Sequence, residues 1–149
     1  MKMDIEQEII FNKTDVPVTT EWQYDERELE YDCRILGGFI KFAPNCQNKL
    51  LVCPKVGGSP TASTPIPEFG KDANQWLIGD GDFVTFSSFR KAKQGEKIIM
   101  AYKNTDGDGD TRTLFAAIRI IRSEIGKLEK LSFTEWLELF PKVLKSWLT

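Results

Sequence analysis

Residues 106–110 read DGDGD, so three carboxylates alternate with two glycines. Carboxylates spaced in this way suit a hard cation such as calcium, because glycine lets a loop turn around the ion. The spacing matches the first half of a calcium-binding loop. The second half fails, since Thr111 stands where the pattern needs glycine and Ala117 stands where it needs glutamate. We predict a plain turn here and at the similar segment 79–82, GDGD. The alternative is a metal site formed by Asp106, Asp108 and Asp110.

A second candidate segment, 87–97, reads SSFRKAKQGEK and places basic side chains around one phenylalanine. Proteins hold single-stranded nucleic acid in this way, with cations along the phosphates and aromatic rings stacked on bases. In a strand, Phe86 and Phe89 would face opposite sides, so that one could fill the core while the other contacts a ligand. The alternative is a solvated hairpin turn. The predicted nucleic-acid-binding residues are Phe89, Arg90, Lys91, Lys93 and Lys97.

Much catalytic chemistry is excluded by composition, because the chain contains no histidine. This removes serine and cysteine nucleophiles that depend on a histidine base, as well as histidine zinc ligands. The three cysteines, Cys33, Cys46 and Cys53, form no C-x-x-C pair, and the sequence has no phosphate-binding glycine loop. We therefore expect no cofactor and favour a non-enzymatic protein, although carboxylate and metal chemistry stay open.

The elements that would position these residues are mostly strands. Apolar residues alternate with polar ones in much of the first half, as in half-buried antiparallel strands. A Gly37-Gly38 pair allows a bulge or a sharp bend. The strands are expected at 3–11, 16–24, 29–35, 39–42, 50–53, 76–78, 83–89 and 97–102.

Two segments are harder to assign. Residues 54–75 are rich in proline, glycine and serine, so we expect a long loop rather than a linker between domains. The segment 112–125 fits a helical stripe ending at Gly126, and it also fits a strand that follows a turn. We favour the strand.

The C-terminal segment 132–149 has the pattern of an amphipathic helix. Ser132 and Glu135 form a capping box, and an apolar stripe that includes Trp136 and Trp147 follows it. Pro141 should kink or split this helix. We expect the stripe to cover the open face of the sheet, because a short β-rich domain needs a cover.

The charge is unevenly distributed along the chain. The net charge is −2, but residues 1–32 carry ten acidic and three basic residues, whereas residues 33–149 carry twelve acidic and seventeen basic ones. An acidic part of this kind repels nucleic acid and a basic part attracts it. The sequence has no apolar run long enough for a membrane helix and no signal-peptide pattern. With an odd number of cysteines, we expect reduced thiols and a cytoplasmic protein.

We therefore predict one domain over residues 1–149 with an α+β fold: a curved antiparallel sheet or small β-barrel capped by the C-terminal amphipathic helix. The favoured function is a non-enzymatic binding module that contacts single-stranded nucleic acid or acts within a nucleoprotein complex. One alternative is a protein-interaction or homodimerisation module with a protein partner. Another is a metal-dependent enzyme or calcium-binding domain that uses the acidic-glycine loops.

Overall fold

The computed structural model describes residues 4–44, 46–69 and 75–123. These residues form eight strands and, within the described ranges, no helix. No segment among them therefore has the length and apolarity of a membrane-spanning helix. In chain order the strands are β1 (Asp4–Val16), β2 (Gln23–Glu28), β3 (Cys33–Phe42), β4 (Leu50–Gly57), β5 (Ser63–Pro65), β6 (Phe83–Ala92), β7 (Lys97–Asn104) and β8 (Arg112–Ser123).

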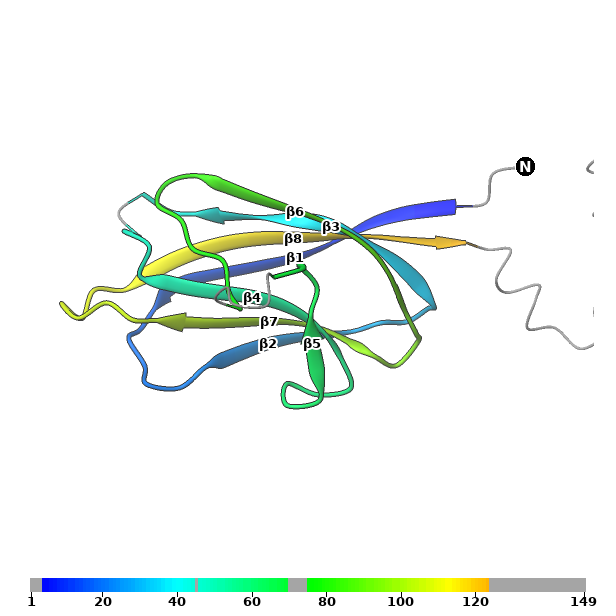
Figure 1. Cartoon of the computed structure of the whole chain (residues 1–149), viewed down its shortest axis with the longest axis horizontal. Coiled ribbons are helices and arrows are strands. Elements are labelled where there is room, and N and C mark those ends of the chain that lie inside the picture. Colours follow the sequence, from blue (N-terminus) through cyan, green and yellow to red (C-terminus); the bar gives the residue numbers. More distant parts are fainter. Residues whose placement is uncertain (1–3, 45, 70–74, 124–149) are drawn as a thin grey trace, which may run out of the picture.

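The strands form two four-stranded antiparallel sheets. The first sheet has the order β1-β8-β3-β6 and the second has the order β2-β7-β4-β5. The pairs are nested, since β1 pairs with β8, β2 with β7, β3 with β6 and β4 with β5. The chain is thus one long hairpin rolled into two layers, which is the jelly-roll arrangement. Figure 1 shows the start of β1 and the end of β8 side by side at one end of the molecule.

The core lies between the two sheets. Alternate residues of each strand point inward, as the period of two along a strand requires. The buried side chains of the first sheet include Phe11, Ile40 and Ile118, and those of the second include Val52 and Ile98. Each sheet therefore covers the inner face of the other.

The predicted α+β fold is wrong. The described residues are all-β, and their two sheets do not close into a barrel. The error has a physical cause: we expected one sheet that needed a helix as its cover, whereas the second sheet supplies that cover. The helix predicted over 132–149 lies outside the described residues.

Gly37 marks a bulge in β3, as its sequence allowed. Ile35 and Ile40 are both buried although they are five positions apart, an odd offset that would place them on opposite faces of a regular strand. The register shift lies between Ile35 and Gly37. Gly37 has a φ of 128°, and a Cβ there would lie 2.2 Å from the carbonyl oxygen of Phe86. Only glycine fits this position without displacement of the backbone.

Two ambiguous segments are strands in part. The favoured strand over 112–125 is confirmed for β8. The predicted loop 54–75 contains the end of β4 and all of β5, which pair through residues 55–57 and 63–65. The composition of the segment did not predict this hairpin, because the paired stretches are short and its two strands contain the prolines Pro54 and Pro65.

Candidate functional site

The side of the first sheet that faces away from the second sheet, here called the outer face, is covered by four rows of residues. Each row crosses all four strands, because directly opposite residues of neighbouring antiparallel strands lie on the same face. In the order β1, β8, β3 and β6, the rows are Asn12–Phe115–Lys41–Phe83, Ile10–Ala117–Phe39–Thr85, Glu8–Arg119–Gly37–Ser87 and Glu6–Ile121–Arg34–Lys91.

The first two rows hold an aromatic cluster. The ring centroid of Phe39 lies 5.6 Å from that of Phe83 and 6.0 Å from that of Phe115. The ammonium group of Lys41 lies 5.4 Å from the Phe83 ring centroid. Phe83 is 61% exposed and Ile10 is 50% exposed, so the cluster is open to solvent. Contiguous exposed apolar side chains of this kind are typical of interaction surfaces.

Sequence reasoning missed this cluster. Phe39, Phe83 and Phe115 lie far apart in the chain, and only the register of three strands brings them together. The alternation of polar and apolar residues predicts that each one lies on a strand, but it does not tell which strands are neighbours.

The charges of the outer face are divided between its two edges. Glu6 and Glu8 lie on β1, at one edge, and Glu6 makes an ion pair with Arg119 of β8. Arg34 of β3 and Lys91 of β6 are direct cross-strand partners toward the other edge, and both are exposed. Like charges directly opposite one another destabilise a sheet unless an opposite charge compensates them.

The predicted nucleic-acid-binding residues are not assembled on one surface. Phe89 is 79% exposed, while Phe86 packs against the core, so the expected division between the two rings is confirmed. Arg90 instead faces the second sheet, where its guanidinium group donates hydrogen bonds to the Pro65 carbonyl, at 3.1 Å, and to Thr64. It thereby ties the edge strand β6 to β5.

The lysines of the segment are also separated. Lys91 lies on the outer face with Arg34, and Lys93 lies exposed in the turn that follows β6. The ammonium group of Lys97, on β7, lies 3.3 Å from the carboxylate of Glu26. Of the five predicted nucleic-acid-binding residues, Phe89 and Lys91 therefore lie on the outer face, and the other three do not.

The acidic loop at 106–110 is built around Asp106. The carboxylate of Asp106 is buried, pairs with the guanidinium group of Arg112 and accepts a hydrogen bond of 2.9 Å from the Asp108 amide. Buried Asn104 supports the loop, because its side-chain amide donates to the carbonyl groups of Val16 and Asp110. Arg112 thus supplies the positive charge that a metal ion would otherwise supply. The described residues contain no group of three metal-ligating side chains placed to hold an ion.

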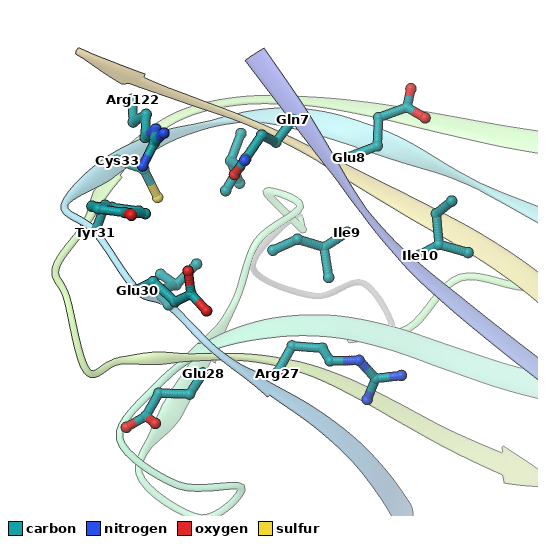
Figure 2. Close-up of a pocket in the computed structure, with 12 residues that line it drawn as sticks. Gln7, Glu8, Ile9, Ile10, Arg27, Glu28, Glu30, Tyr31, Cys33 and Arg122 are labelled. Carbon is teal, nitrogen blue, oxygen red and sulfur yellow. The ribbon is translucent and has the colours of Figure 1, made fainter. Parts of the chain in front are cut away.

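A hollow of about 320 Å³ opens between β1 and the segment that leads from β2 to β3. Figure 2 shows Ile9 directed toward its middle, with Arg122, Cys33 and Tyr31 grouped at one end. The guanidinium carbon of Arg122 lies 3.9 Å from the centre of the Tyr31 ring. The Nε and Nη1 atoms of Arg122 are buried and have no hydrogen-bond partner.

The hollow does not favour catalysis. Cys33 is the thiol that lines it, and burial raises the pKa of Cys33 to about 11, with smaller contributions from Asp32 and Glu96. A thiol with this pKa is almost fully protonated near neutral pH, and the thiolate is the nucleophilic form. The hollow is also lined by the acidic residues Glu8, Glu28 and Glu30 and by the basic residues Arg27 and Arg122.

Comparisons with known proteins show no family. No protein-family model matches the chain, and no curated protein matches it. Among solved structures, the chain is similar to the protein of Bacillus endospore appendages, a family of disulfide-linked pili, with 9% identity and a TM-score of 0.44 over 83% of this chain and 90% of that one.

Two further matches are viral proteins. One is from the Gx strain of infectious bursal disease virus, with 7% identity and a TM-score of 0.40 over 79% of this chain and 32% of that one. The other is from turnip yellow mosaic virus, with 12% identity and a TM-score of 0.33 over 83% of this chain and 95% of that one. Likenesses at this level do not bear on nucleic-acid binding or enzyme activity.

Proposed function

We propose that this chain is a non-enzymatic protein-interaction module that associates with a second copy of itself through the outer face of the first sheet. The observation that supports the proposal is the exposed aromatic cluster of Phe39, Phe83 and Phe115, which lies on a sheet face next to Ile10. Burying such a cluster removes apolar surface from water, which drives most protein association. Aromatic residues are also enriched in the cores of protein interfaces.

The charges favour a protein partner over a nucleic acid. A nucleic-acid groove presents mainly cations, because it must neutralise successive phosphates. The outer face instead carries the acids Glu6 and Glu8 on the same surface as Lys91 and Arg34. Arg90, which was predicted to contact phosphates, is hydrogen-bonded to β5. Acids and bases at opposite edges of one face suit a partner that carries both signs, and a second copy is such a partner.

The oligomeric state of the full chain tests this proposal. Sedimentation velocity over a concentration series should show a monomer–dimer equilibrium. Phe83→Ser should weaken it, because truncation of an interface residue that contributes strongly to binding costs at least about 2 kcal/mol, or roughly 30-fold in Kd. The matched control is Tyr24→Ser, which removes an aromatic ring that is similarly exposed on β2 of the second sheet. This control should leave Kd unchanged.

Three results would contradict the proposal. The first is a wild-type chain that stays monomeric at hundreds of micromolar. The second is equal weakening by Phe83→Ser and Tyr24→Ser, since association would then not depend on the outer face. The third is a monomer that binds a labelled single-stranded oligonucleotide with an affinity that falls steeply with salt, because this behaviour indicates phosphate contacts. That result would restore the nucleic-acid hypothesis.

A further inference from the structure

We infer that the two copies pack face to face about a twofold axis that runs parallel to the strands of the first sheet, so that β1 of each copy lies over β6 of its partner. This inference rests on the proposed self-association and adds its geometry. It follows from how the rows of the outer face are ordered, and it identifies Glu6 with Lys91 as the pair of charges that meets across the interface.

A twofold axis in the plane between two such faces has two simple orientations. If the axis runs along the strands, each row meets the same row of the partner in reverse order. The row that begins with Asn12 then places Phe115 over Lys41 of the partner, so that a cation meets an aromatic ring. The row that begins with Glu6 places Glu6 over Lys91 of the partner.

The other orientation is unfavourable. An axis across the strands would place the aromatic row of one copy on the charged row of the partner. Lys41 would then lie over Arg34 of the partner, and this contact between two cations would occur twice. Like charges that face each other across an interface oppose association. Both orientations keep the strand lines of the two layers nearly aligned, as in common sheet-on-sheet packing, so the charges decide between them.

The pairing would also compensate a charge conflict within each copy. Arg34 and Lys91 are direct cross-strand neighbours, and within the described part of the chain neither makes an ion pair. A carboxylate brought over them from β1 of the partner would offset their mutual repulsion. The acidic edge of one copy thus faces the basic edge of its partner, and the same contact occurs twice in the dimer.

Charge reversal tests the orientation. Glu6→Lys places a lysine against Lys91 at both ends of the twofold contact, and Lys91→Glu places a glutamate against Glu6 at both ends. Each single variant should raise the dimer Kd by about tenfold or more, because each repulsion occurs twice. An equimolar mixture of the two variants should restore Kd to within about threefold of wild type, because every contact in the mixed dimer again joins opposite charges.

The matched control is Lys93→Glu, which makes the same change of net charge two residues along the chain, in the turn beyond β6. It should leave Kd within about threefold of wild type. Circular dichroism should show that all variants are folded, because exposed ion pairs such as Glu6–Arg119 contribute little to stability. If Lys93→Glu weakens association as much as Lys91→Glu does, the effect is one of net charge and the inference fails.

A thiol cross-link gives a readout that is independent of charge. Glu6→Cys mixed with Lys91→Cys should form a disulfide-linked dimer under mild oxidation, and neither variant alone should do so. The native thiols will not compete, because Cys33, Cys46 and Cys53 are all buried.

The two proposals can fail separately. If the wild type dimerises and Phe83→Ser weakens it, but the mixture is not restored and the cross-link does not form, the orientation is wrong and the self-association stands. If the wild type stays monomeric, both proposals fail.

Discussion

The carboxylate of Asp106 pairs with the guanidinium group of Arg112, and both side chains are almost fully shielded from solvent. The hydrogen bond from the Asp108 amide lowers the pKa of Asp106 most, and Arg112 lowers it further, whereas burial acts in the opposite direction. Asp106 therefore keeps its charge in the folded protein at pH values where the unfolded chain begins to take up a proton.

This difference predicts an acid-sensitive contribution to stability. Because the pKa of Asp106 is lower in the folded state, its contribution is fully present above the ordinary aspartate pKa near 4 and is lost as the pH falls through the folded value. Thermal melts from pH 7 to pH 2 should show a fall in Tm below about pH 4. In Asp106→Asn the Tm should be several degrees lower at pH 7, since Arg112 loses its buried carboxylate partner and keeps only the exposed Asp110, 3.9 Å away, and the fall with acid should be smaller. An acid response identical to that of wild type would show that Asp106 is not responsible.

Gly37 should be intolerant of substitution. In Gly37→Ala the new methyl group would meet the backbone of Phe86 and Ser87 at a positive φ, so strain and overpacking should together cost about 2–4 kcal/mol. Urea denaturation measures this change in the free energy of unfolding. Gly58→Ala is the matched control, because its Cβ would meet nothing within 4 Å. If both variants unfold at the same urea concentration, the bulge accommodates a side chain and our interpretation of β3 is incorrect.

The thiols should react slowly. Burial raises the pKa of both Cys33 and Cys53 to about 11, so the thiolate fraction at pH 8 is roughly 100-fold smaller than that of a free thiol. Alkylation of the native protein by iodoacetamide, followed by mass spectrometry, should therefore be slower by at least this factor at these two residues than in urea-unfolded protein. Rapid modification of the folded chain would show that these strands open frequently.

Arg90 and Lys93 were predicted to act together, and the structure separates their roles. Arg90→Ala removes two hydrogen bonds to β5, so we expect a loss of about 1–2 kcal/mol in the free energy of unfolding and faster amide exchange near Pro65. In Lys93→Ala an exposed turn side chain is lost, and stability should change by less than about 0.5 kcal/mol. Equal effects would mean that the bridge from β6 to β5 contributes no stability.

Local patterns in the sequence predicted several strands but not how they pair. Alternation located most of β1 and β3, the strands expected over 83–89 and 97–102 correspond to β6 and β7, and the glycine pair located the bulge. The strand expected over 16–24 was wrong, because its alternating apolar residues belong mostly to the connection before β2. Trp76 to Ile78 contributes only a single bridge, at Leu77. An alternating pattern indicates that every second side chain of a segment is buried. Some connecting loops are half-buried in the same way, so the pattern alone does not prove a strand.

The fold class and the candidate surface depended on information that no local pattern carries. The apolar face of a β-sheet is expected to need a cover. Only the pairing of strands that are distant in the sequence shows that a second sheet provides this cover. The same holds for the aromatic cluster, whose Phe39, Phe83 and Phe115 come from three strands. By contrast, the opposite orientations of Phe86 and Phe89 followed from their spacing of three residues within one strand. This expectation needs only local sequence, and it was confirmed.

The nested pairing of the strands has a consequence for folding kinetics. Asp4 is the cross-strand partner of Ser123, so among the described strands the first one synthesised pairs with the last one. Closing so long a loop costs entropy before any contact of β1 is gained, and proteins dominated by such distant contacts fold in milliseconds to seconds rather than microseconds. The β4–β5 hairpin is the most local pair, with 63–65 following 55–57 closely. Folding is therefore expected to begin at the β4–β5 hairpin and to finish with the pairing of β1 and β8, so the apolar side of β1 waits for β8 before it can pack in its final position.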